Sequence, residues 1–185
     1  MLKTASLGFP RIGANRELKK AVESYWKGSI SLVELQKVAS EIKAKNWQSQ
    51  KAAGIHYIPS NDFSFYDHIL DFLALFGAVP ERFKFHGKDV NLDLVFAMAR
   101  GVQKDGLDAT AMEMTKWFDT NYHYIVAEFK KNQQFKISSS KIFDDYLQAF
   151  KAFLMACGFA EETITTIQTE EQFCLNAEKG LTARE

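Results

Sequence analysis

The apolar positions between residues 18 and 26 repeat at the spacing of an amphipathic helix. Gly28 stands where a glycine commonly ends a helix in the left-handed conformation. Residues 8–16 form the preceding loop, in which Pro10 fixes φ and Gly13 permits a bend. We expect the side chain of Asn15 to cap the first helical turn by accepting a hydrogen bond from a backbone amide. The apolar face follows the i, i+3, i+4, i+7, i+8 pattern and consists of Leu18, Ala21, Val22, Tyr25 and Trp26.

Further helices are predicted from capping signals and apolar spacing. A second helix begins at the capping box of Ser31 and Glu34 and is expected to end near Gly54. A third is expected to end at Gly77, after which helices are predicted near residues 92–100, from about 141 to 158, and in pieces at 161–168 and 170–179. The apolar face predicted for the third helix consists of Phe65, Ile69, Phe72, Leu73 and Phe76.

Short apolar runs between these helices indicate strands. They are predicted at residues 4–7, 55–58, 111–117 and 122–126, with an edge strand at 134–137 and a turn-rich loop at 103–108. The expected fold class is α/β, helix-rich, with a small incomplete sheet and a helical C-terminal tail. We expect a domain at residues 1–150 and the tail at 151–185.

Composition and charge argue against nucleic-acid binding, membrane association and a metal site of the usual spacing. The formal net charge is zero, so the chain has no global field to attract nucleic acid or an anionic membrane. No apolar stretch is long enough to span a membrane and no leader pattern is present, so the expected compartment is the cytoplasm. Cys157 and Cys174 lack the spacing of a metal site, and we expect two buried, reduced thiols.

The loop before the first helix is a candidate anion site. Arg16 and Lys19 lie three residues apart on the first turn, beside backbone amides and the positive end of the helix dipole. The alternative is an ordinary corner with solvated charges, because Gly8 and Gly13 match neither common phosphate-binding glycine pattern. Lys116, which lies among apolar residues, either extends its ammonium group into solvent or holds an anionic ligand.

Three longer segments resemble a known family. They are residues 7–28 (LGFPRIGANRELKKAVESYWKG), 58–67 (IPSNDFSFYD) and 113–124 (EMTKWFDTNYHY), and residues 77–83 and 96–101 agree as well. Together they resemble, in order from about residue 7 to 147, the N-terminal region of cobalamin-independent methionine synthase. The resemblance implies part of a longer chain of two (β/α)₈ barrels that uses zinc to transfer a methyl group from methyltetrahydropteroyl-polyglutamate to homocysteine.

The resemblance also implies binding residues. In the family the N-terminal half helps to hold the polyglutamate tail of the folate, and the corresponding positions here are Arg16, Glu17, Leu18, Lys19 and Lys116. Zinc and homocysteine bind in the C-terminal barrel, and this chain has no cysteine and histidine set for them. We therefore expect no catalytic residue, metal or cofactor site in this chain, and a partial, barrel-like fold, because a closed barrel takes about 250 residues.

Some positions depart from the family pattern. Ala127 and Ile142 stand where proline is expected, and no family motif is found after about residue 147. The expected function is the folate-tail-binding part of the synthase, not catalytic alone, with a C-terminal barrel as a further partner. The alternatives are a truncated relative that acts as a binding, regulatory or self-associating module, and a remnant without function. Because an open sheet edge is an aggregation hazard, we expect the tail helices to pack over it or a second copy to dimerise there.

Overall fold

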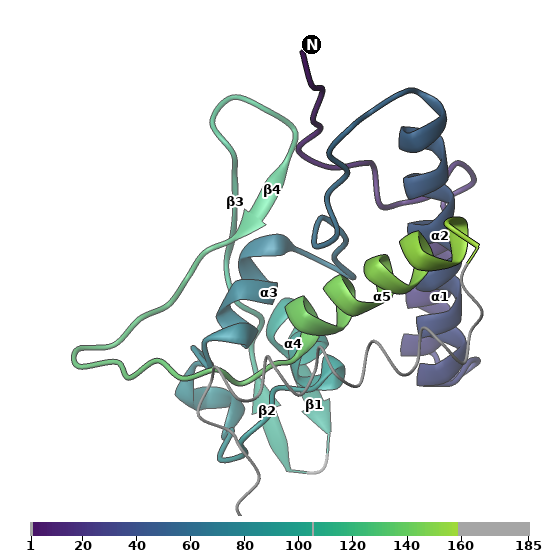
Figure 1. The fold of residues 1–185 in the computed structure, drawn as a ribbon. Helices are drawn as coiled ribbons and strands as arrows, with labels where there is room; N and C mark the ends of the chain where they lie inside the picture. Colours follow the sequence, from purple (N-terminus) through teal and green to yellow (C-terminus); the bar gives the residue numbers. More distant parts are fainter. Residues whose placement is uncertain (1, 105, 159–185) are drawn as a thin grey trace, which may run out of the picture. The chain divides into compact units, whose positions relative to one another are not determined.

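The computed structural model describes residues 2–104 and 106–158. The chain separates into two compact units, Met1–Lys141 and Ile142–Glu185. Figure 1 shows the order of the elements along the chain. The described part of the second unit is the body of helix α5 (Lys141–Ala156), which begins at the residue predicted from the sequence.

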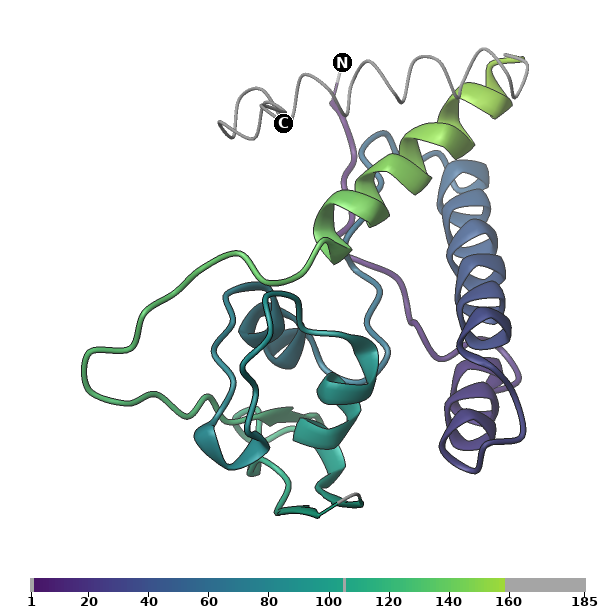
Figure 2. The same cartoon turned by 90° about the horizontal axis from the view of Figure 1, so that it is seen from below.

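Helices α1 (Glu17–Trp26) and α2 (Leu32–Ala52) pack side by side in the first unit (Figures 1 and 2). Phe63 and Phe96 complete the hydrophobic cluster between them. The predicted apolar face of α1 is confirmed, with Tyr25 and Trp26 partly buried against the same cluster. The buried side chains of the two helices in this cluster are Leu18, Ala21, Val22, Leu35, Ala39 and Ile42.

The ends of these helices follow the sequence signals with one exception. Ser31 and Glu34 form the predicted capping box, in which the Ser31 amide donates to the Glu34 carboxylate at 2.7 Å. Gly28 ends α1 in the left-handed conformation, as predicted. The predicted Asn15 cap is wrong, because the N-cap residue is Arg16, at φ 60° and ψ 36° and without a side-chain cap.

Helix α3 (His68–Leu75) buries a different face from the one predicted. The buried residues are Leu70, Leu73 and Ala74, while Phe72 is 47% and Phe76 is 45% exposed. The physical reason is the helix start: Asp67 caps α3, so Phe65 precedes the helix and cannot share its apolar stripe. The predicted apolar face of α3, which included Phe65, is therefore wrong for this helix.

The second hydrophobic cluster lies around α3, the 3₁₀ turn η1 (Glu81–Phe83) and α4 (Leu92–Arg100). Helix α4 has the predicted bounds. Leu92 packs against both clusters, and Phe96 of α4 meets Trp26 of α1 edge to face at 5.3 Å between ring centroids. The two clusters are therefore connected through α4.

The strands in the described part of the chain form two antiparallel hairpins. β1 (Val102–Lys104) pairs with β2 (Leu107–Ala109), where only a loop was predicted. β3 (Met114–Lys116) pairs with β4 (His123–Ile125), and both lie within the strands predicted at 111–117 and 122–126, although their pairing was not predicted. The fold is thus mixed α/β and helix-rich, and the described residues contain no closed barrel.

The other predicted strands are shorter or absent. Residues 4–7 and 55–58 form an isolated parallel bridge between Ala5 and Tyr57, flanked by hydrogen bonds between Thr4 and His56, in place of the predicted strands. The edge strand predicted at 134–137 is wrong. Instead, the amides of Lys136 and Ser138 donate to carbonyls at the end of α3, which satisfies the backbone without a sheet. Cys157 is exposed rather than buried. Cys174 and the helical pieces predicted at 161–168 and 170–179 lie outside the described residues, and the domain boundary at 150 stays a prediction.

Candidate functional site

The loop before α1 is tied to residues 62–67, which we call the bridging segment. Nη1 of Arg11 donates to the Ser64 carbonyl at 3.0 Å, and Nη2 donates to the Tyr66 carbonyl. The Phe9 amide donates to the Asp62 carboxylate at 2.8 Å. These bonds join two of the family-like segments, because residues 7–28 supply the donors and residues 58–67 supply the acceptors.

The third family-like segment meets the bridging segment at Asp67, which is only 2% exposed. Its carboxylate accepts hydrogen bonds from the Leu70 amide at 3.0 Å, the Tyr122 hydroxyl at 3.2 Å and the Ile125 amide at 3.4 Å. Burial, followed by the negative charge of Asp67, raises the pKa of Tyr122, while the charge of Arg11 lowers it. The bridging segment therefore contacts both the loop before α1 and the β3–β4 hairpin.

Residues 13–19, which we call the α1 tip, present two of the predicted cations. Arg16 is exposed, and Lys19 is half-exposed in an i,i+4 ion pair with Glu23 at 3.7 Å. The left-handed backbone of Arg16 is uncommon for a residue with a side chain. Both cationic side chains are accessible to a ligand from solvent.

The backbone amides of the α1 tip are less available than the sequence suggested. The Glu17 carboxylate accepts from the Asn15 amide at 2.9 Å. Hydrogen bonds from the amides of Glu17 and Asn15 are the largest causes that lower the pKa of Glu17, and the charge of Lys45 adds to them. Gly13 allows this arrangement, because a Cβ there would lie 2.2 Å from Glu17 Oε2. The Glu17 carboxylate therefore occupies the backbone amides of the α1 tip that were expected to bind an anionic ligand.

The remaining predicted residues lie in different settings. Leu18 is 1% exposed, and its amide donates to the Ile12 carbonyl at 3.2 Å, so its side chain belongs to the core. Lys116 is exposed on β3, opposite His123. Among the described residues, no hydrogen bond or ion pair joins Lys116 to Arg16 or Lys19. The structure brings their segments to one bridging segment, and a shared binding surface stays a prediction.

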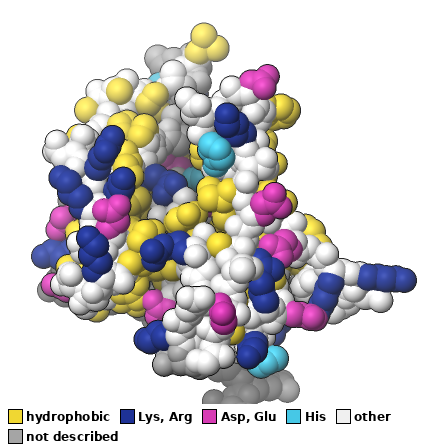
Figure 3. Space-filling view, turned by 180° about the vertical axis from the view of Figure 1, so that it is seen from behind, with side chains coloured by type: hydrophobic (Ala, Val, Ile, Leu, Met, Phe, Trp, Pro, Cys, Tyr) yellow, Lys and Arg dark blue, Asp and Glu magenta, His cyan; other side chains and the backbone are white. Residues whose placement is uncertain are grey.

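Sequence reasoning missed Arg11, Asp67 and Lys45. Arg11 and Asp67 were visible only as members of loop motifs. The partners of Arg11, and the Tyr122 and Ile125 partners of Asp67, lie more than fifty residues away in the chain. Lys45 could have been found, because two antiparallel helices joined by a short loop place the later part of α2 beside the start of α1. Figure 3 shows several Lys and Arg side chains along the side of the molecule formed by α1 and α2.

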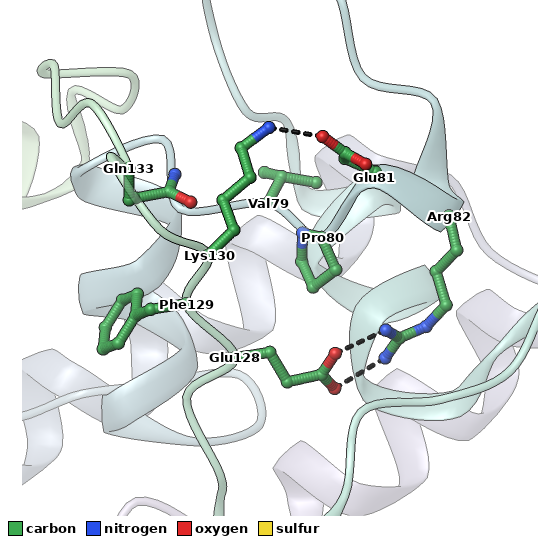
Figure 4. A pocket seen from close by; sticks show the side chains of 8 residues that line it. All are labelled: Val79, Pro80, Glu81, Arg82, Glu128, Phe129, Lys130 and Gln133. Atoms are coloured by element: carbon green, nitrogen blue, oxygen red, sulfur yellow. Dashed lines mark hydrogen bonds and ion pairs between the residues drawn. The ribbon is translucent and has the colours of Figure 1, made fainter.

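A separate pocket of about 290 Å³ lies between η1 and the segment after β4 (Figure 4). Arg82 forms a bidentate ion pair with Glu128, in which its two terminal nitrogens lie 2.5 and 2.7 Å from the two carboxylate oxygens. Lys130 forms an ion pair with Glu81. These pairings raise the pKa of Arg82 and lower the pKa values of Glu128 and Glu81. The charged groups that line the pocket are matched to one another, so the pocket is a structural junction.

No group of three or more His, Cys, Asp or Glu side chains is arranged to hold a metal ion in the part of the chain that the structure describes. Within the same residues, no helix has the length and apolar character needed to cross a membrane.

Comparison with known proteins identifies the family. Residues 3–157 match the family model described as the cobalamin-independent synthase, N-terminal domain. The chain is 58% identical over 149 residues to a 5-methyltetrahydropteroyltriglutamate–homocysteine methyltransferase of Flavobacterium johnsoniae, covering 80% of this chain and 19% of the relative. The enzyme of the same name from Saccharomyces cerevisiae is 49% identical over 155 residues, covering 80% and 20% of the two chains. The chain thus spans about a fifth of the length of these relatives. It belongs to the family of the cobalamin-independent synthase N-terminal domain.

Proposed function

We propose that this chain binds the glutamate tail of a methyltetrahydropteroyl-polyglutamate through Arg16, Lys19 and Lys116. Family membership supports the proposal, as does the triglutamate substrate in the names of the relatives. The observation that carries it is the bridging segment. The loop that leads to Arg16 and the hairpin that carries Lys116 are bonded to the same six residues.

The chemistry of the ligand suits exposed cations. A chain of γ-linked glutamates carries a carboxylate at each unit, and each charged hydrogen bond contributes about 1.5–3 kcal/mol. Because the net charge of the protein is zero, attraction must come from local groups such as Arg16 and Lys19. Glu17 already accepts the tip amides, so side chains rather than the helix dipole would bind the tail. In this proposal Glu17 shapes the loop and Leu18 anchors the helix.

We assign methyl transfer, homocysteine binding and zinc to the rest of a longer family chain in the cytoplasm. Zinc would supply an activated thiolate of homocysteine, and its usual ligands are cysteine and histidine. The cysteines of this chain lack the spacing of such a ligand set. The parallel contact between Ala5 and Tyr57, separated by two helices, supports the further proposal that the first unit begins a (β/α) barrel.

Titration with a folate triglutamate tests the proposed function. We expect Lys19→Gln and Lys116→Gln each to raise the Kd about tenfold, which corresponds to about 1.4 kcal/mol, and added salt to weaken binding. Lys37→Gln is the matched control, because Lys37 is an exposed lysine of α2 outside the α1 tip. The proposal fails if the wild-type chain does not bind, or if the control loses as much affinity as the other two.

Exposed aromatic residues favour a second candidate function, self-association. Phe72 and Phe76 stack at 6.5 Å on the outer face of α3, and Phe129 meets Phe135 edge to face at 5.7 Å. Such exposed apolar groups mark interaction surfaces when they are contiguous. Sedimentation at increasing protein concentration tests this candidate: a rising mass that Phe72→Ser abolishes supports it, and a constant monomer mass rejects it.

A further inference from the structure

Charge is distributed unevenly along the chain, although the formal net charge is zero. Residues 11–51, which include α1 and α2, contain nine Lys and Arg against four Glu and no Asp, a net charge of +5. The rest of the chain therefore carries a net charge of −5. A local positive field lies around the two helices, on the side of the molecule where Figure 3 shows dark-blue side chains.

The cations of α1 line its outer face. The exposed Lys19 and Lys20 lie on the side opposite the buried residues, and Lys27 follows Lys20 by two helical turns, about 10 Å along the axis. The carboxylate in this row is Glu23, which pairs with Lys19 at 3.7 Å. Within residues 2–104 and 106–158, Lys20 and Lys27 form no ion pair. The buried side of α1 consists of Leu18, Ala21 and Val22.

Helix α2 adds a cation beside the α1 tip. Nδ2 of Asn46 donates to the Pro10 carbonyl at 3.4 Å, so this part of α2 lies next to the loop before α1. The neighbouring Lys45 is exposed, and its charge is one of the causes that lower the pKa of Glu17. The positive surface of α1 therefore continues onto α2 at the α1 tip.

We propose that Lys20, Lys27 and Lys45 form an electrostatic guidance surface, which speeds the capture of a polyanionic ligand and delivers it to the α1 tip. The ligand class is a γ-linked oligoglutamate, so this inference rests on the proposed function. It goes beyond that function because the three lysines act on the rate of association and make no contact in the bound complex.

The effect follows from long-range electrostatics. A surface that gathers charge of one sign raises the local concentration of an oppositely charged ligand, and such steering increases association rates by about 10- to 1,000-fold. At physiological salt the field is screened over about 8 Å, so it acts near the two helices and not around the whole protein. Charges outside the contact change the association rate and its salt dependence, whereas contacting groups change the dissociation rate.

Stopped-flow binding of a folate triglutamate to the full chain measures the two rate constants separately. In the triple variant Lys20→Gln/Lys27→Gln/Lys45→Gln, we expect the association rate constant at low salt to fall about fivefold. We expect the dissociation rate constant to stay the same, because the variant keeps Arg16 and Lys19 of the α1 tip. At about 0.5 M salt the wild type and the triple variant should associate at the same rate.

The matched control removes the same charge from another part of the protein. Lys84, Lys88 and Lys131 are exposed and lie outside α1 and α2. In the triple variant Lys84→Gln/Lys88→Gln/Lys131→Gln, we expect the association rate constant to change by less than about 1.5-fold. An equal loss in both triple variants would show that net charge matters and its placement does not, which would overturn the inference.

The remaining outcomes separate this inference from the proposed function. If the wild-type chain binds no triglutamate, the proposed function and the inference both fail. If it binds, but the Lys20, Lys27 and Lys45 triple variant associates at the wild-type rate, only the inference fails. A faster dissociation with an unchanged association rate would make these lysines direct contacts and also overturn it. If the triple variant does not fold, as judged by its thermal transition, Lys27→Gln decides, with an expected decrease of about 1.7-fold in the association rate constant.

Discussion

Replacing Arg82 with methionine removes the group that joins η1 to the end of β2 and to the segment after β4. Arg82 donates to both oxygens of Glu128, and its Nε donates to the Thr110 carbonyl at 2.9 Å. The ion pair is about one-third exposed, so we discount it to about 1 kcal/mol, and the bond to Thr110 adds about 1 kcal/mol. We expect Arg82→Met to lower the free energy of unfolding by about 2 kcal/mol.

Urea unfolding of single and double variants measures this contribution. The double-mutant cycle with Glu128→Gln should give a coupling of about 1 kcal/mol. Lys130→Gln is the control from the same pocket. Its pair with Glu81 is 58% and 79% exposed, so solvent screens it, and we expect a much smaller change in the free energy of unfolding. If Arg82→Met destabilises no more than Lys130→Gln, the junction does not stabilise the fold as argued.

Two further predictions concern stability. Gly101→Ala should destabilise more than Gly28→Ala by about 1–2 kcal/mol in the same assay. Both glycines have positive φ, but only at Gly101 would a Cβ meet backbone atoms, at 2.9 and 3.0 Å, and equal losses would contradict this. Hydrogen bonds from Ser31 lower the pKa of Glu34, so its contribution to stability is present above the ordinary pKa of a glutamate and is lost as the pH falls through the lower, folded-state pKa. Glu34→Gln should reduce the loss of stability on acidification, and an unchanged pH profile would refute this.

Local sequence signals predicted the helix ends well. The capping box of Ser31 and Glu34, the glycine after α1 and the bounds of α4 depend on residues within a few positions of one another. Strands were also predicted at the places of β3 and β4, although their pairing as a hairpin was not. The β1–β2 hairpin was missed, although Gly106 at positive φ follows an aspartate in a pattern typical of tight turns.

Signals that depend on tertiary contacts were not available from the sequence. The exposed side of α3 could not be assigned because two faces of this apolar helix compete for the core, and Asp67 sets the phase. The α1 tip was predicted as a cationic site, yet nothing in the sequence showed that Glu17 would accept its amides. The roles of Arg11 and Asp67 also require the fold, since their partners are distant in the chain.

The most direct test of the central claim is the affinity for a folate triglutamate in the wild type, Lys19→Gln, Lys116→Gln and the double variant at two salt concentrations. If two separate groups of cations hold one tail, each single variant weakens binding and reduces its salt dependence, and the double variant does so further. Binding that is insensitive to salt, or unaffected by Lys116→Gln, would contradict the account.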